Sequence, residues 1–169
     1  MNARLGRYGS KRWSGIALVA TALALAGAEN RASTEKSADE KISFYQARIS
    51  GPGTYPAYAR LGCAYLEKFR ETGETTWYNL GLHRLRQSLR YQSNFEALLG
   101  LAVALSERHF FKEALPYAEE AVSAMPSDLE AAGVLFDIQL ALGRVQVAEN
   151  GLNAMLKAQP GFHSLSRLA

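Results

Sequence analysis

Apolar side chains recur at intervals of three, four and seven residues in three stretches of this chain. Such intervals place the side chains of each stretch on one face of an α-helix. We interpret the three stretches as the first helices of three helical hairpins. The positions on these faces are Tyr58, Leu61, Gly62 and Tyr65; Leu98, Leu101, Ala102 and Leu105; and Ala132, Leu135, Phe136 and the polar Gln139.

Small residues mark the second helices, and their pattern repeats at a fixed offset. Ala114 recurs as Ala148 and Pro126 recurs as Pro160, in each case 34 residues later. Two helices of one hairpin approach closely only where side chains are small, because overpacking costs about 1–3 kcal/mol. The corresponding positions are Ala114, Ala118 and Ala121; Ala148, Leu152 and Met155; and, in the first hairpin, Gly81, Leu85 and Ser88.

Helix ends have their own signals. Gly73 predicts the end of the first helix of the first hairpin, and Thr75 or Thr76 is expected to cap the next one. Three Ser-x-x-Glu sequences have the form of capping boxes, each worth about 1 kcal/mol. These are Ser37 with Glu40, Ser93 with Glu96, and Ser127 with Glu130.

These features resemble the tetratricopeptide repeat family over roughly residues 38–169. The family pattern is W-x2-L-G-x2-Y, then A-x3-F, then P, with a period of 34 residues. "YARLGCAY" carries its head, with Tyr58 in place of Trp. The resemblance implies an all-α fold, an α-α superhelix (solenoid) of about three helix-turn-helix repeats. An ordinary helical bundle is the alternative, but it would not explain the fixed offset.

The repeats divide the chain into segments. The first repeat departs from the pattern, because 16 residues separate Tyr65 from Gly81 where the motif has nine. We read the surplus as about one extra turn on each helix. The predicted segments are a signal peptide (1–28), a flexible linker (29–36), an N-terminal half-repeat helix (37–54), the lengthened first repeat (55–94), the second and third repeats (95–128 and 129–162) and a short C-terminal cap (163–169).

The N-terminal segment is typical of export. It has four basic residues and no acidic ones before an apolar run from Gly15, which ends in the small-x-small sequence Ala26-Gly27-Ala28. This combination predicts a cleaved secretory signal peptide and a periplasmic or secreted protein. The alternative is an uncleaved segment that anchors the protein in the membrane. The run is shorter than the roughly 20 residues that span a bilayer.

Removing this segment changes the charge. The whole chain has 19 basic and 16 acidic residues, but residues 29–169 have 15 and 16. The basic character therefore belongs to the leader and does not indicate a nucleic-acid or membrane-surface partner. Cys63 is the single cysteine, so an internal disulfide is excluded. It is read as a packing residue, with a reactive or intermolecular thiol as the alternative.

The sequence offers no catalytic or metal motif. His83, His109 and His163 fall on a second helix, an inter-helix turn and the C-terminal tail. HExxH, CxxC, G-x-S-x-G and a phosphate-binding glycine loop are all missing from the sequence. We therefore expect a protein that is not an enzyme and that needs no cofactor or metal. His109 is interpreted as a turn residue, at a position where the family often has Gly.

The resemblance implies a concave groove, lined by the first helices, that binds protein segments. Only Arg60 is basic among the groove positions, so the Lys/Asn carboxylate clamp of some family members is missing. An apolar floor with acidic edges would favour an apolar, basic partner segment. The acidic groups could equally be solvated surface, and the chain's own N-terminal segment or a second copy could fill the groove. The implied residues are Arg60, Cys63, Leu66, Glu67, Glu96, Leu99, Val103, Glu107, Glu130, Asp137 and Leu140.

Aromatic residues suggest a second surface. Trp77 and Tyr78 lie near the lengthened hairpin, and Phe110 lies at a turn position that is usually polar. They pack the hairpin tip or form a contact surface for a partner or a second copy. The whole pattern predicts an exported scaffold or adaptor that binds protein, whose oligomeric state stays open. The alternatives are a structural subunit of a cell-envelope assembly and a peptide-binding periplasmic chaperone.

Overall fold

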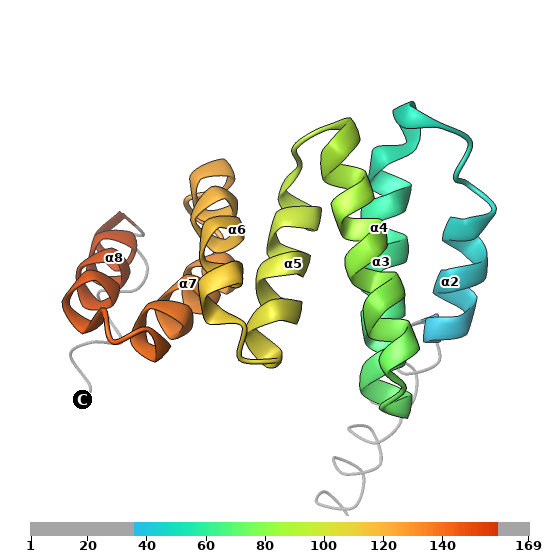
Figure 1. Ribbon diagram of the computed structural model, residues 1–169. Coiled ribbons are helices and arrows are strands. Elements are labelled where there is room, and N and C mark those ends of the chain that lie inside the picture. Colours follow the sequence, from blue (N-terminus) through green and yellow to red (C-terminus); the bar gives the residue numbers. More distant parts are fainter. Residues whose placement is uncertain (1–35, 159–169) are drawn as a thin grey trace, which may run out of the picture. The chain divides into compact units, whose positions relative to one another are not determined.

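The computed structural model describes residues 36–158, and every element in this range is a helix (Figure 1). The elements are α2 (Ala38–Gln46), the short 3-10 helix η1 (Pro52–Thr54), α3 (Tyr55–Thr72), α4 (Thr75–Tyr91), α5 (Phe95–Glu107), α6 (Phe111–Ala124), α7 (Leu129–Ala141) and α8 (Val145–Ala158). The chain divides into two units, Met1–Ser37 and Ala38–Ala169, and all these elements belong to the second. The predicted all-α repeat fold is confirmed, while the predicted signal peptide, most of the linker and the cap at 163–169 lie outside the described residues.

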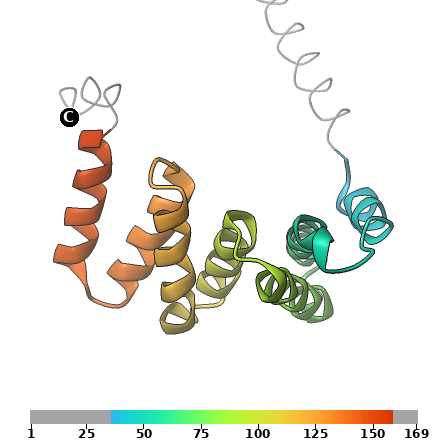
Figure 2. The same ribbon diagram turned by 90° about the horizontal axis from the view of Figure 1, so that it is seen from above.

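Three hairpins follow one another in chain order (Figures 1 and 2). They pair α3 with α4, α5 with α6, and α7 with α8. The first helices also contact each other, α3 with α5 and α5 with α7, and each second helix packs against the first helix of the next hairpin. The helices α3, α5 and α7 therefore form one layer, and α4, α6 and α8 form the other.

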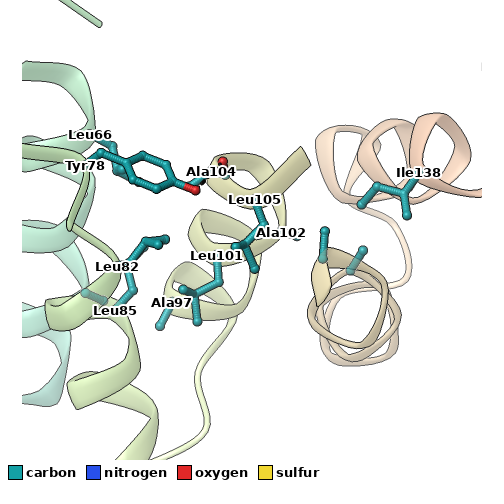
Figure 3. Close-up of a cluster of buried hydrophobic side chains, with 13 residues drawn as sticks. Leu66, Tyr78, Leu82, Leu85, Ala97, Leu101, Ala102, Ala104, Leu105 and Ile138 are labelled. Atoms are coloured by element: carbon teal, nitrogen blue, oxygen red, sulfur yellow. Dashed lines mark hydrogen bonds between the residues drawn. The ribbon is translucent and has the colours of Figure 1, made fainter. Parts of the chain in front are cut away.

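The apolar core runs through these hairpins without a break (Figure 3). Leu85 of α4, Leu101 of α5 and Ile138 of α7 are fully buried members of one cluster. Burial of this kind stabilises a protein by about 25 cal/mol per Å² of apolar surface. Because each hairpin completes its burial on its neighbours, the stack rather than the single hairpin is the stable unit.

The small positions of the second helices are buried as predicted. Ala114, Ala118 and Ala121 have no exposed surface. In the first hairpin the matching place of Ala121 is taken by Ser88, which is also fully buried. Its hydroxyl donates to the carbonyl oxygen of Tyr55 at 2.7 Å, so the polar atom has a partner.

The first hairpin is longer than the others. The helix α3 has 18 residues and α4 has 17, whereas α5 has 13 and α6 has 14. Gly73 ends α3 in the left-handed conformation, and its N–H donates to the carbonyl of Phe69 at 2.7 Å, as expected of a C-terminal glycine cap. The expectation that Thr75 or Thr76 caps α4 is wrong, since α4 already begins at Thr75 and its N-cap is Glu74.

Two of the three predicted capping boxes are also wrong by one residue. Asn94 caps α5, with its side-chain oxygen accepting from the Ala97 N–H at 3.0 Å. Asp128 caps α7, accepting from the Ala131 N–H at 2.8 Å. Asn and Asp are as good at this position as Ser, and here they stand directly before the first helical residue, so they displace Ser93 and Ser127 from the cap.

The turns inside the second and third hairpins are built alike. His109 has φ 61° and Gly143 has φ 76°, both left-handed. The N–H of Phe110 donates to the carbonyl of Leu105 at 2.9 Å, and the N–H of Arg144 makes the same bond to Gln139 at 2.8 Å. The interpretation of His109 as a turn residue at a glycine position is confirmed.

The helix α2 packs on α3 as a lone second helix would. It is shorter than the helix predicted over 37–54, because the chain turns after Gln46 and Gly51 adopts φ 149° ahead of Pro52. Only Ala38 and Ile42 of α2 are buried. Polar contacts add to this small apolar contact, and Lys68 of α3 pairs with Asp39 at 2.7 Å.

Candidate binding cleft

A cleft of about 340 Å³ lies between α3, α5 and the first turn of α7. Its apolar lining comes from one face of α3 and one face of α5, because positions three and four apart on a helix lie side by side. Ion-pairing side chains stand at its edges. The lining residues are Cys63, Leu66, Glu67, Arg70, Phe95, Glu96, Leu99, Gly100, Val103 and Glu130.

Most of the predicted groove residues meet here. Cys63, Leu66, Glu67, Glu96, Leu99, Val103 and Glu130 line the cleft. Arg60 and Glu107 do not line it, but each is paired with a residue that does. Asp137 and Leu140 lie further along α7, and both are exposed outside the cleft.

The floor of the cleft is fixed by the packing beneath it. Leu66 is only 2% exposed, and it fills the space above Gly81 of α4. Gly100 faces Leu85 and the Cys63 sulfur, where a Cβ would lie 3.1 Å and 3.4 Å from them. A glycine at this point leaves room for α5 to approach α3 beneath the cleft.

Burial, together with the nearby carboxylates of Glu96 and Glu67, raises the pKa of the Cys63 thiol to about 11, because both disfavour the negatively charged thiolate. The thiol is therefore protonated at neutral pH and contributes to the floor as an apolar group. This favours the packing interpretation of Cys63 over a reactive thiol.

Ion pairs engage most of the charged groups at the rim. Glu67 pairs with Lys41 of α2 at 2.8 Å. Arg60 pairs with Glu96 at 3.1 Å, and this contact raises the pKa of the arginine. The expectation of an acidic rim with a single basic residue is therefore wrong, because the rim is largely a set of matched charges.

Arg70 is a cleft residue that the sequence analysis missed. It pairs with Glu107 at 3.0 Å, so it joins the ends of α3 and α5. The family pattern places groove positions only on a first helix of ordinary length, and Arg70 stands on the extra turn of α3. Its spacing of three from Glu67 and seven from Cys63 was the available signal. Phe95 was also missed, because it is the first residue of α5.

Trp77, Tyr78 and Phe110 do not form one exposed surface. Tyr78 is 6% exposed and packs in the core, where its hydroxyl donates to the carbonyl of Ala104 at 3.2 Å (Figure 3). Trp77 is half-buried and stacks on Tyr65 with ring centres 5.7 Å apart. The prediction of Tyr78 as a surface contact is thus wrong, because the hydroxyl finds an inter-helix partner. Phe110 is 48% exposed, at the turn between α5 and α6.

The described residues offer neither a metal site nor a second pocket of ligand size. No group of three His, Cys, Asp or Glu side chains there is arranged to hold a metal ion. A second hollow, between α6, α7 and α8, measures about 60 Å³, which is far below the size of a ligand site. None of the helices in residues 36–158 has both the length and the apolar character needed to cross a membrane.

Comparison with known proteins agrees with the repeat architecture. Residues 110–168, which begin at the turn before α6, match the tetratricopeptide repeat family model. No curated protein matches the chain. The fixed offset between hairpins and the matching turns at His109 and Gly143 agree with this match, and residues 110–168 belong to the tetratricopeptide repeat family.

Proposed function

We propose that this protein is an exported interaction module that binds a segment of another protein in the cleft between α3, α5 and α7. The observation that carries the proposal is the cleft itself, an apolar floor bordered by charged residues on the first helices. Stacked helical repeats use such concave surfaces for binding. Its volume of about 340 Å³ lies at the lower end of the usual range for binding pockets.

The partner segment is apolar where it meets the floor and basic where it meets Glu130, the lining carboxylate that has no ion pair with any residue between 36 and 158. An apolar floor can bury one face of an amphipathic helix or the side chains of an extended segment. Charges at the rim act mainly on orientation and on the rate of association, and they are sensitive to salt. Export is supported by the basic residues and apolar run of residues 1–28.

Crosslinking in the native host, followed by affinity purification, tests this function. We expect one dominant partner, and we expect Leu99→Glu and Val103→Glu each to reduce its recovery at least tenfold, because each places a charge in the apolar floor. Val147→Glu is the matched control, since Val147 is 54% exposed on α8 and away from the cleft. It should recover the partner as well as the parent does.

The same experiment separates the alternatives. A peptide-binding chaperone would recover many unrelated proteins. A structural subunit of a cell-envelope assembly would remain with its partner in fixed stoichiometry through purification without crosslinking. If both cleft variants fold normally by circular dichroism and recover the partner as the parent does, the cleft is not the binding surface.

A further inference from the structure

Four charged side chains line the cleft, and three of them already have a partner of opposite sign within the chain. These are Glu67 with Lys41, Glu96 with Arg60, and Arg70 with Glu107. Each of these partners belongs to another helix, so the pairs also join α2 and α5 to α3. A ligand gains little from these three groups, because binding to one of them requires an existing ion pair to separate.

Glu130 is the exception. It lines the cleft from the first turn of α7, its side chain is exposed, and it forms no ion pair with any residue between 36 and 158. It lies near enough to the cleft floor to contribute to the raised pKa of Cys63. The cleft is therefore electrostatically uneven, with matched charges along α3 and α5 and one uncompensated negative charge at the α7 end.

We infer that the cleft takes a partner segment with one cationic side chain, Lys or Arg, held at the α7 end against Glu130, and with large apolar side chains in the space above Cys63, Leu99 and Val103. This inference rests on the proposed function and adds a direction to it. The single charge fixes which end of the segment lies toward α7. A charge on a partner fixes register and orientation more than it adds affinity.

The size of the cleft limits how much of the segment it holds. A volume of about 340 Å³ is at the bottom of the range for sites that bury a whole small ligand. It accommodates one or two large side chains, while the rest of the segment stays on the surface. The recognition unit is therefore short: an apolar anchor and a cation at one side of it.

The test uses the full chain and three matched sets of short, end-blocked fluorescent peptides. Every peptide has an apolar Leu-Trp anchor among Ser and Gly residues, and the sets differ only in carrying Lys, Gln or Glu beside the anchor. Binding is measured by fluorescence anisotropy at low and high salt. We expect the Lys set to bind the parent about two- to five-fold more tightly than the Gln set, which is the effect of an exposed ion pair. The Glu set should bind more weakly than both, and the differences should shrink at high salt.

Two substitutions of Glu130 assign the preference to this residue. Glu130→Gln should remove the difference between the Lys and Gln sets, and Glu130→Lys should reverse it in favour of the Glu set. Glu130 is exposed, so both variants should retain the fold. A Lys preference that persists in Glu130→Gln, or equal binding of Lys and Glu sets by the parent, would overturn the inference.

Val103→Glu separates this inference from the proposed function. If it abolishes binding of all three sets while the parent shows no charge preference, the cleft binds segments but Glu130 does not orient them. If Val103→Glu binds as the parent does, or if no set binds the parent at all, the proposed function fails as well. If the parent sediments as a dimer and Val103→Glu as a monomer, the cleft is occupied by a second copy, which also overturns the inference.

Discussion

Gly62 of α3 and Gly81 of α4 face each other where the two helices of the first hairpin cross. A Cβ on Gly62 would lie 3.0 Å from the carbonyl oxygen of Gly81, and a Cβ on Gly81 would lie 3.1 Å from that of Gly62. Each glycine also faces a leucine of the other helix, with Leu85 above Gly62 and Leu66 above Gly81. The crossing is thus nearly symmetric, and it leaves no room for a methyl group on either side.

Gly62→Ala and Gly81→Ala should each destabilise the protein by about 1–3 kcal/mol, because the new methyl group would lie within 2.9 Å of a leucine side chain. The loss outweighs the gain of about 1 kcal/mol that Ala offers over Gly inside a helix. Gly133→Ala is the control, since nothing lies within 4 Å of its Cβ position on α7. It should be neutral or slightly stabilising in thermal unfolding, and equal losses in all three variants would contradict the packing argument.

Ala121→Leu should destabilise by about 1–3 kcal/mol for the same reason in the second hairpin. Ala121 has no exposed surface and packs between Leu98 and Ala131. Ala124→Leu lies on the exposed side of the same helix and should change the free energy of unfolding by less than about 0.5 kcal/mol. Urea unfolding of the two variants gives the comparison, and an unchanged midpoint for Ala121→Leu would mean that the register of the second repeat is wrong.

His109→Gly should stabilise the protein by about 0.5–1 kcal/mol. A left-handed conformation is unfavourable for a residue with a Cβ and costs nothing of this kind for Gly. Part of the gain is offset by the lost contact between the His109 and Phe111 rings, whose centres are 5.5 Å apart. The reciprocal variant, Gly143→Ala, should lose stability. A lower melting temperature for His109→Gly would show that the ring contact outweighs the backbone strain.

The Cys63 thiol should make stability fall at alkaline pH. Its pKa is about 11 in the folded protein and near 9 when unfolded, so between these values the unfolded state binds fewer protons and gains in stability relative to the folded state. The free energy of unfolding should therefore decrease from pH 9 to pH 11, and less steeply in Cys63→Ala. Native Cys63 should also react slowly with iodoacetamide at pH 8, whereas the urea-unfolded chain reacts quickly. Equal rates would show that the thiol is not buried.

We expect the native host to remove residues 1–28 as a signal peptide. A cleaved signal peptide places the mature N-terminus at or near Glu29, directly after Ala28. Mass spectrometry of protein isolated from the native host should detect that terminus. An intact Met1 on a membrane-bound form would favour the anchored alternative, and an intact Met1 on a cytoplasmic form would exclude export.

The hairpins could be predicted because their signals are local and repeated. The offset of Ala114 and Ala148 sets the register of the second helices, and both residues are buried. The extra turns of the first hairpin followed from chain length alone. The caps were less predictable, since Ser93 and Asn94 are adjacent residues with the same chemistry, and one residue of helix extension decides between them.

The cleft was only partly predictable. Helical spacing identifies which face of α3 or α5 carries a side chain, but it does not show which charges meet. The pairing of Arg70 with Glu107 joins residues 37 positions apart and depends on how closely α5 approaches α3 at Gly100. Likewise, Tyr78 could not be recognised as a core residue, because its hydroxyl needs the carbonyl of Ala104 on a different hairpin.

Packing becomes looser toward the C-terminal end of the described range. The helix α3 is buried along much of its length, whereas α7 buries only Ala131, Ile138 and Gln139, and α8 buries Ala148 within its described side chains. In a stack held by neighbour contacts, opening begins where those contacts are fewest. We therefore expect the last hairpin to open before α3 and α5 do. A segment bound mainly to α3 and α5 would stay attached through this opening, and only its contact with Glu130 would come and go.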